Sequence, residues 1–270
     1  MSTTSKMTTN PVGVSYTTHQ VTTDNKWNVD TTTLITPVIP PVEVPPPTLA
    51  PIIPINALNS GILDDSNNWK GDWDKSTPKT ATGISKYIDS SNGRNYNVVY
   101  TNKAGFRFHN SFATVKAAVL NFCTDLYVLC DDWTQVQNLE IDMNQVLQDG
   151  RTVIMGIQAA SGSKSWEYTT TPTGSSHWNK SNISVNPTTW KPGIWKHIRL
   201  FYSLTSAGIV TYIGVEVDGI YTPFANAVGL SAIALGWEPL GLLLCNFQQE
   251  GNTAKGIINI YAKQYQHFYW

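Results

Sequence analysis

From about residue 57 to the C-terminus, the chain alternates apolar and polar residues in short runs that turn residues separate. Nine of these runs have the length and the period of two that β-strands show. They cover residues 98–100, 106–108, 117–129, 138–147, 152–159, 195–204, 209–218, 240–248 and 256–269. A helical pattern is only weakly indicated, at residues 230–235. Strands that follow one another without helices predict an all-β fold, a two-sheet antiparallel β-sandwich.

The first 56 residues have a different composition and lack this alternation. Residues 1–36 contain twelve Thr, and residues 37–54 contain eight of the fifteen Pro. Because proline cannot donate to a β-ladder and favours polyproline II, we predict an extended Thr/Pro-rich arm or linker over residues 1–56 and one domain over residues 57–270. Aliphatic residues such as Val38 and Ile39 are interleaved with the prolines. They indicate that the arm packs either on its own domain or on a neighbouring subunit.

The low and balanced charge narrows the range of partners. Charged residues make up 14% of the chain, and the formal net charge is -1 at pH 7. There is therefore no electrostatic reason to expect nucleic acid or an anionic membrane as a partner. No apolar run reaches the ~18 residues that a transmembrane helix needs, so no membrane span is predicted.

The aromatic content and the polar residue types point to the cell exterior. Ten Trp occur together with abundant Thr, Ser, Asn and Gly. This mixture is common in extracellular β proteins and in carbohydrate binders, where flat rings lie against sugar faces. The first ten residues lack the apolar core of a signal peptide. An extracellular or cell-surface location therefore implies a removed leader, another export route or delivery as part of a particle.

The cysteines do not form a recognisable metal site. Cys123, Cys130 and Cys245 cannot all pair within one chain, and none of them stands in a metal-ligand spacing. An odd separation along one strand directs Cys123 and Cys130 to opposite faces, so buried free thiols are expected. One disulfide stays open as an alternative if that strand bends or if Cys245 approaches it.

No cofactor is expected, and calcium is the one metal for which candidates exist. Asp64-Asp65 and Asp131-Asp132 are paired carboxylates of the kind that suits a hard cation in a structural site. Neither pair has the spacing of an EF-hand loop. We therefore favour solvated turns for both.

The run from residue 138 to 144 carries the main candidate chemistry. It reads Asn-Leu-Glu-Ile-Asp-Met-Asn, so a strand would place its apolar residues on one face. The other face would carry Asn138, Glu140, Asp142 and Asn144. Glu140 and Asp142 would stand about 6 to 7 Å apart and point the same way. That spacing suits sugar chemistry, and it also suits an ordinary solvated strand face.

Two later segments carry a family resemblance. The strand Trp195-Lys196-His197 precedes a strand that ends in Asp218-Gly219, and this combination resembles the pattern of concanavalin A-like jelly rolls. The Leu-Glu-x-Asp-x-Asn-Gln strand at residues 139–145 and the C-terminal Phe-Tyr-Trp are similar to those of bacterial concanavalin A-like domains of unassigned function. The resemblance implies a concanavalin A-like jelly roll over residues 57–270.

The same superfamily includes laminarinase-like retaining glycosidases, whose catalytic strand reads Glu-x-Asp-x-Glu. The resemblance would assign the nucleophile to Glu140 and the helper role to Asp142, but the acid/base position 144 is Asn. An amide cannot deliver the proton, and general acid catalysis typically contributes about 10² to 10⁴-fold. We therefore assign no catalytic residue and do not expect an enzyme. An impaired glycoside hydrolase is the third hypothesis for function.

The strand is better suited to binding sugar than to hydrolysing it. Its amides and carboxylates can hydrogen-bond sugar hydroxyls along a concave face. Trp166 or Trp178 would supply a stacking ring at the edge, since the two residues flank a polar loop, although packing in the core is the alternative for each.

The first hypothesis is an extracellular, non-catalytic, lectin-like domain that binds a polysaccharide or glycan. The second is a structural or assembly subunit of a surface layer, filament or particle. In that case the N-terminal arm would contact other copies of the chain.

Overall fold

The computed structural model describes residues 6–9, 15–18, 48–73, 75–115, 121–170 and 178–270. The chain divides into two compact units, residues 1–47 and residues 48–270. In the first unit, Lys6–Thr9 (β1) pairs antiparallel with Ser15–Thr18 (β2), a pairing that the Thr-rich pattern did not predict. Residues 19–47, which hold most of the proposed arm, lie outside the described residues. The extended arm and the boundary at residue 56 stay predictions.

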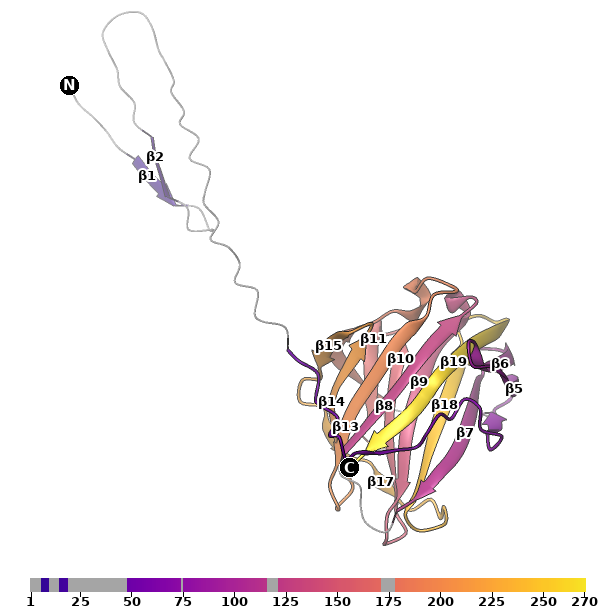
Figure 1. Cartoon of the computed structure of the whole chain (residues 1–270). Helices are drawn as coiled ribbons and strands as arrows, with labels where there is room; N and C mark the ends of the chain where they lie inside the picture. Colours follow the sequence, from indigo (N-terminus) through magenta and orange to yellow (C-terminus); the bar gives the residue numbers. More distant parts are fainter. Residues whose placement is uncertain (1–5, 10–14, 19–47, 74, 116–120, 171–177) are drawn as a thin grey trace, which may run out of the picture. The chain divides into compact units, whose positions relative to one another are not determined.

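The second unit is built from two antiparallel sheets (Figure 1). The first, called here the β9 sheet, has the strand order β12-β11-β10-β9-β18-β7-β4, with β17 paired to β10. Its strands are Lys70–Trp73 (β4), Gly105–Thr114 (β7), Val136–Val146 (β9), Thr152–Ala160 (β10), Ser165–Thr169 (β11), Trp178–Ser184 (β12), Ala232–Ile233 (β17) and Leu242–Gly251 (β18).

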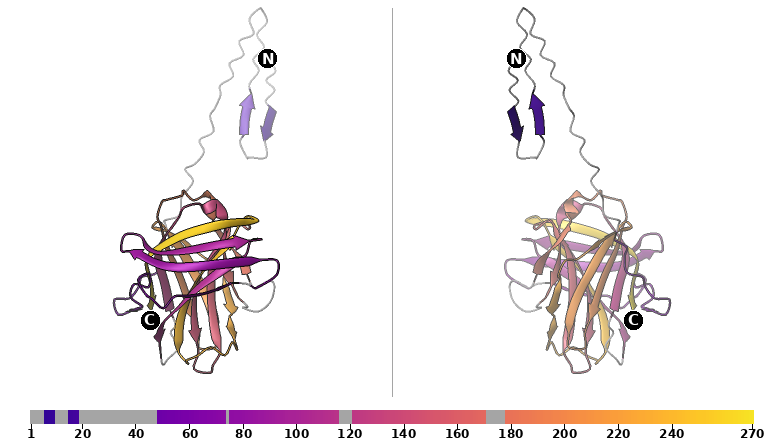
Figure 2. Two further views of the ribbon diagram at one scale, coloured as in Figure 1. Left: turned by 90° about the vertical axis from the view of Figure 1, so that its right-hand side faces the viewer. Right: turned by 90° about the vertical axis from the view of Figure 1, so that its left-hand side faces the viewer.

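The second sheet, called here the β8 sheet, has the order β15-β14-β13-β8-β19-β6-β5. Figure 2 shows its long C-terminal strand β19, in yellow, next to strands from the beginning of this unit. The strands are Leu58–Asn59 (β3), Thr80–Asp89 (β5), Gly93–Thr101 (β6), Asn121–Cys130 (β8), Lys196–Leu204 (β13), Ile209–Val217 (β14), Ile220–Pro223 (β15), Val228–Leu230 (β16) and Lys255–Tyr269 (β19). Two 3₁₀ turns, Trp133–Gln135 (η1) and Pro187–Thr189 (η2), complete the described elements.

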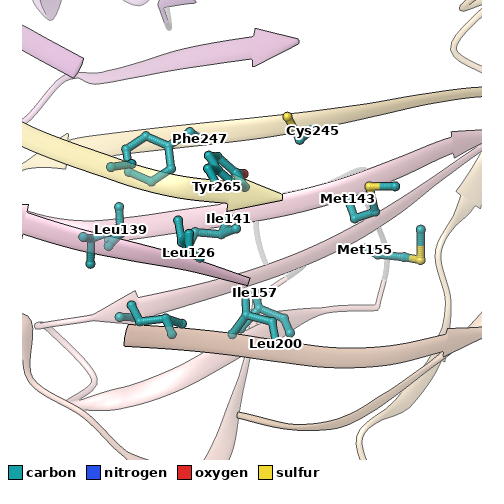
Figure 3. Packing of buried hydrophobic residues seen from close by; sticks show 14 of the residues in the cluster. Leu126, Leu139, Ile141, Met143, Met155, Ile157, Leu200, Cys245, Phe247 and Tyr265 are labelled. Carbon is teal, nitrogen blue, oxygen red and sulfur yellow. The ribbon is translucent and has the colours of Figure 1, made fainter. Parts of the chain in front are cut away.

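The all-β, two-sheet antiparallel prediction is confirmed, and the core lies between the sheets. In β9, Leu139, Ile141 and Met143 are fully buried, as the alternation predicted. Figure 3 shows Leu139 and Ile141 near Phe247 of β18 and Leu126 of the other sheet, and Met143 near Met155. Burial of each such aliphatic side chain contributes roughly 1.5 to 3 kcal/mol to the free energy of folding, relative to leaving it exposed. Burial of this apolar side holds the register of β9 and directs its polar side chains away from the core.

All nine predicted runs correspond to strands in the interior of the two sheets, and only residues 117–120 of the run 117–129 lie outside the described residues. The weak helical signal at residues 230–235 was wrong, because the short strands β16 and β17 occupy that region. Both strands pair with longer neighbours, β14 and β10. Tertiary pairing overrides a weak local propensity in such a short segment.

The Asp218-Gly219 turn forms as its residue types require. Both residues have positive φ, 53° and 82°, and they join β14 to β15 in a tight hairpin. This is the geometry of a type I′ turn, which favours Asp-Gly. The Asp218 carboxylate accepts from the backbone N–H of His197 at 3.0 Å and from Lys196 Nζ at 2.6 Å. The turn is thereby attached to the strand of the Trp-x-His motif.

The cysteines are free and buried. Cys130 and Cys245 belong to the core cluster, whereas Cys123 points to the opposite face of β8, as the odd spacing predicted. Burial raises the pKa of the Cys130 and Cys245 thiols to about 12 and also raises that of Cys123. Since thiolates are the reactive form, all three are expected to be unreactive at neutral pH.

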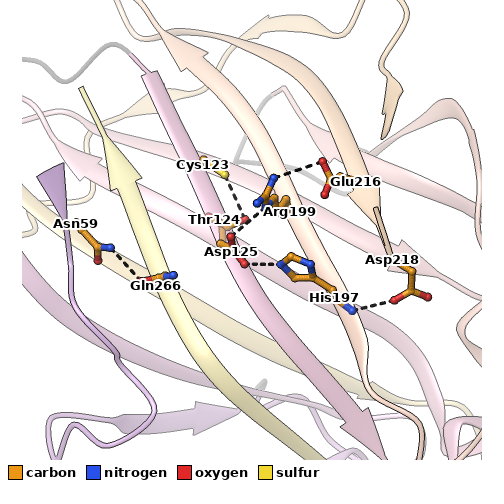
Figure 4. A network of polar contacts seen from close by, with 9 residues as sticks. All are labelled: Asn59, Cys123, Thr124, Asp125, His197, Arg199, Glu216, Asp218 and Gln266. Carbon is orange, nitrogen blue, oxygen red and sulfur yellow. Dashed lines mark hydrogen bonds and ion pairs between the residues drawn. The ribbon is translucent and has the colours of Figure 1, made fainter. Parts of the chain in front are cut away.

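The outer face of the β8 sheet carries a network of charged side chains (Figure 4). Asp125 accepts from Arg199 Nε at 3.0 Å and contacts His197 Nε2 at 2.7 Å. Arg199 Nη1 also lies 3.5 Å from Glu216. The network connects β8, β13 and β14 through their side chains.

Asp125→Asn is expected to lower the free energy of unfolding by about 1 kcal/mol, because one amide oxygen must then serve two donors. Chemical denaturation at pH 7 measures this difference. The matched control is Asp131→Asn, since the structure describes no side-chain partner for the exposed Asp131. Equal effects of the two substitutions would show that the network does not stabilise the sheet.

Candidate functional site

The side of the β9 sheet that faces away from the core, called here the polar face, carries a row of polar side chains. The row follows from the register, since directly paired residues share a face. It consists of Asp72, Arg107, Gln248, Glu140, Gln158, Glu167 and Lys180, one from each strand between β4 and β12.

Neighbours in this row are hydrogen-bonded in pairs. Arg107 donates twice to Asp72, from Nε at 2.9 Å and from Nη2 at 2.6 Å. Gln248 Nε2 donates to Glu140 at 2.9 Å, and Gln158 Nε2 donates to Glu167 at 2.5 Å. These bonds fix the side chains in defined rotamers and leave further amide and carboxylate lone pairs available to a ligand.

A second row lies one strand pleat away and is more enclosed. Asn246 Nδ2 donates to Asp142 at 3.2 Å. On the other side of Asp142 stands Gly156, whose missing side chain leaves room for Trp178. A Cβ at this glycine would lie 2.8 Å from Asp142 Oδ1 and 3.1 Å from Cη2 of Trp178. The absent side chain therefore allows the indole ring to lie beside the carboxylate.

Glu140 is the electrostatically unusual member of the polar face. Its burial raises its pKa well above the usual range, and so do the charge of Asp142 and a hydrogen bond with that carboxylate. The charge of Glu250 acts in the same direction, and Arg107 opposes it. Glu140 therefore retains its proton at a pH where an exposed glutamate is ionised.

His109 adds a neutral polar group near the paired carboxylates. It lies opposite Lys70 and Asn246 in the second row. Burial and the nearby positive charge of Arg107 lower its pKa below the ordinary value. The imidazole is therefore uncharged at neutral pH and has both a donor and an acceptor nitrogen.

The first row leads into a pocket at the end of β7 and β18. This end pocket has a volume of about 400 Å³. Its floor includes Arg107, Gln248 and Glu250, and its rim includes Lys79 and Lys103. Glu250 accepts from Asn138 Nδ2 at 2.6 Å, which connects the pocket to β9. Trp73 also lines the pocket, but it is paired with Phe106 and packs against the core cluster.

The structure brings together four of the six predicted site residues in β9 and places the two tryptophans differently. Asn138 and Glu140 are half-buried, whereas Asp142 and Asn144 are 2% and 0% exposed. Trp178 lies on the polar face beside Asp142. Trp166 does not reach this face, because it belongs to the core cluster and is 1% exposed. Of the two tryptophans, only Trp178 can therefore supply the stacking ring that was expected at the edge.

Several polar-face residues were missed because their partners are distant in the sequence. Arg107 and His109 alternate with Phe106 and Phe108, and Gln248 and Glu250 occupy the polar positions of β18. The alternation in both runs indicates an amphipathic strand. Only the register shows that these residues lie opposite Glu140 and its neighbours.

The candidate calcium carboxylates differ in their surroundings, since Asp132 has partners within its own turn whereas the structure describes no side-chain partner for Asp131. Asp132 Oδ1 accepts from the backbone N–H of Thr134 at 2.9 Å and caps the 3₁₀ turn η1. Asp64 is buried, so the solvated turn expected there was wrong, and its backbone carbonyl accepts from Arg94 Nε at 2.7 Å. Among the described residues, no group of three or more His, Cys, Asp or Glu is arranged to hold a metal ion. In the same part of the chain, none of the helices could cross a lipid bilayer.

Comparison with known proteins gives structural similarity only. No protein-family model matches the sequence, and no curated protein does either. The fold is similar to alginate lyase vAL-1 from Chlorella virus, with a TM-score of 0.42, 11% identity and coverage of 75% of this chain and 93% of that one. It is also similar to arcelin-5, a lectin-like defense protein from Phaseolus vulgaris, with a TM-score of 0.41 and 8% identity. That similarity covers 75% of this chain and 99% of arcelin-5.

A family 11 carbohydrate-binding module from Clostridium thermocellum, in complex with a β-1,3-1,4-mixed-linked tetrasaccharide, has a TM-score of 0.35 and 9% identity. The similarity covers 77% of this chain and 94% of that module. At this level, the similarities carry no argument about function. The function proposed below rests on the residues of the polar face.

Proposed function

We propose that the protein binds a polysaccharide or glycan through the polar face, without hydrolysing it, outside the cell or at the cell surface. The observation that carries this proposal is the row of hydrogen-bonded amides and carboxylates that crosses the β9 sheet from Asp72 to Lys180. Pre-ordered amides and carboxylates suit adjacent sugar hydroxyls, each of which both donates and accepts. The low charge and the Trp-rich, Thr-rich composition support the extracellular assignment.

The contact surface is the half-exposed part of this face. Glu140, Gln248 and Glu250 are each half-buried and accessible from the end pocket or beside it. Asp142 and Asn246 lie beside them in the enclosed second row. In this arrangement, the first row would contact sugar, and the second row would hold the first in place. Trp178 would flank the site at the β12 edge.

Replacing Gln248 with Ala is expected to weaken glycan binding about tenfold, because it removes an amide that stands between Arg107 and Glu140. Affinity electrophoresis across soluble β-glucans, xylans, mannans and polyuronates measures the effect. The matched control is Gln266→Ala, since Gln266 is half-buried in the other sheet and bonded to Asn59 at 3.0 Å (Figure 4). Wild-type protein that no glycan retards, or equal losses in both variants, would contradict the proposal.

An assembly function is the second candidate, and one observation favours it. Leu49, Ile52 and Ile55 are 85%, 89% and 107% exposed. Three aliphatic side chains so close together in the sequence are costly to leave in water, and burial against another copy of the chain would remove that cost. Deletion of residues 1–56 should then abolish oligomers that light scattering detects. If the full chain and the deletion variant have the same distribution of molecular mass, the assembly function is contradicted.

A further inference from the structure

We propose that the end pocket binds an anionic substituent, a carboxylate or a sulfate ester, on one sugar of the glycan. This inference rests on the proposed function, because the rest of the glycan would lie along the polar face. It specifies a property that glycan binding alone does not imply, a preference for acidic over neutral chains. The preference would come from the positive groups of the pocket that have no partner.

Three positive and two negative side chains line the pocket, a net charge of +1, and two of the positive groups are unpaired. Asp72 is held by both donors of Arg107, and Glu250 accepts from Asn138 at 2.6 Å. Lys79 and Lys103, by contrast, have neither an ion pair nor a hydrogen bond from their ammonium groups among the residues that the structure describes. Two unpaired ammonium groups at the rim of a concave site attract an anion.

The two lysines are attached to segments that are bonded to each other. Asn102 Nδ2 donates to the carbonyl of Pro78 at 3.0 Å. The backbone N–H of Thr80 donates to Thr101 Oγ1 at 3.1 Å, and the two threonine hydroxyls lie 2.7 Å apart. Each lysine therefore lies directly beside residues that make these bonds. The backbone that carries the two lysines is thereby ordered, which reduces part of the entropic cost of binding.

The backbone at Lys103 is a second, independent observation. Its φ is 58°, in the left-handed region that Gly or Asn adopts more easily than Lys. Asn102 before it also has positive φ, 50°. A lysine in such a position places a long charged side chain at the rim where glycine would give an easier turn. Unfavourable backbone conformations of this kind are concentrated at functional sites.

The remaining surface of the pocket suits the uncharged part of a sugar. Gln248 and Glu250 on the floor present an amide and a carboxylate to hydroxyls. A sugar would thus place its hydroxyls toward β18 and its anionic group toward the two lysines. Because lysine ammonium groups are point charges with no preference for a planar partner, carboxylates and sulfates both fit.

The test uses glycans that differ only in charge. Polygalacturonate is compared with its methyl ester, and carrageenan with its desulfated form, by affinity electrophoresis of the full chain at low ionic strength. Wild-type protein should bind at least one charged glycan about tenfold more tightly than its neutral counterpart. The carboxylate and sulfate pairs show which anion is preferred. Added salt should reduce the difference.

Lys103→Gly should abolish that preference while leaving thermal stability unchanged or higher, since glycine adopts the local φ without strain. The chain offers a closely matched control, Lys164→Gly, because Lys164 is an exposed turn lysine with φ 55° that does not line the pocket. The Lys164→Gly variant should keep the preference for charged over neutral glycans. Lys79→Gln should weaken it without any change of backbone conformation.

Three outcomes would overturn the inference or its basis. Equal binding of charged and neutral counterparts would refute the anionic preference and leave glycan binding standing. Equal losses in Lys103→Gly and Lys164→Gly would refute the role of the pocket, because overall charge would then explain the effect. Absence of binding to every glycan would refute the proposed function itself.

Discussion

Replacing Glu140 with Gln is expected to raise the free energy of unfolding by about 2 kcal/mol at pH 8. The carboxyl lies half-buried beside Asp142, and its pKa is raised by burial and by that neighbouring charge. At pH 8 the wild-type fold must either hold two adjacent negative charges or keep a proton that water would remove. Gln keeps the shape and the hydrogen-bonding capacity of the protonated acid without a titratable proton.

The direction of the pH dependence follows from proton binding. Above the ordinary glutamate pKa of 4.5, the unfolded chain has released this proton while the folded chain retains it. The stabilisation from the protonated form is therefore complete below about pH 4.5 and is lost as the pH rises through the raised pKa of the folded state. Glu140→Gln should remove most of this decrease in the free energy of unfolding with rising pH.

Urea denaturation at intervals from pH 4 to pH 9 measures both effects. The matched control is Glu238→Gln, because Glu238 is an exposed glutamate outside the polar face. Its pH profile should follow that of the wild type. If Glu140→Gln and wild type have parallel profiles, Glu140 does not retain its proton, and the description of the carboxyl pair is wrong.

The interior of the sandwich was predictable from the sequence because interior strands need apolar residues. Strands such as β9 and β18 have neighbours on both sides and one face against the core, so they alternate clearly. The edge strands β4, β5, β12 and β15 were missed, and so was the short interior strand β11. An edge strand has one partner and more solvent contact, and its pattern of mixed polar residues resembles that of a loop.

The polar face was predictable strand by strand, whereas its pairing was not. The alternation in residues 138–144 shows that Glu140 and Asp142 share a face. It does not show that Gln248, more than a hundred residues later, lies opposite Glu140, because a register shift of one residue would reverse the face. Trp166 and Trp178 were equally plausible from the polar loop between them. Their opposite placements follow from the pleat of β11 and the register of β12.

Asn144→Glu, which restores the Glu-x-Asp-x-Glu pattern, is expected to lower the free energy of unfolding by about 3 kcal/mol or more and to produce no hydrolysis. Asn144 is fully buried, and both its amide atoms lack a hydrogen-bond partner among the described residues. Its cross-strand neighbours are Ile154 and Leu244. A carboxylate there would be desolvated without a cation, close to Asp142, and out of reach of a glycosidic oxygen.

Denaturation and a reducing-sugar assay on laminarin and mixed-linkage β-glucan measure the two results. Asn144→Leu is the matched control, because Leu has the branched shape of Asn without its unsatisfied polar atoms. It should be at least as stable as the wild type. Hydrolysis that appears with Asn144→Glu and disappears when Glu140→Ala is added would mean that position 144 reaches substrate. The polar face would then be an active site that has lost its acid, and the binding proposal would give way to the impaired hydrolase.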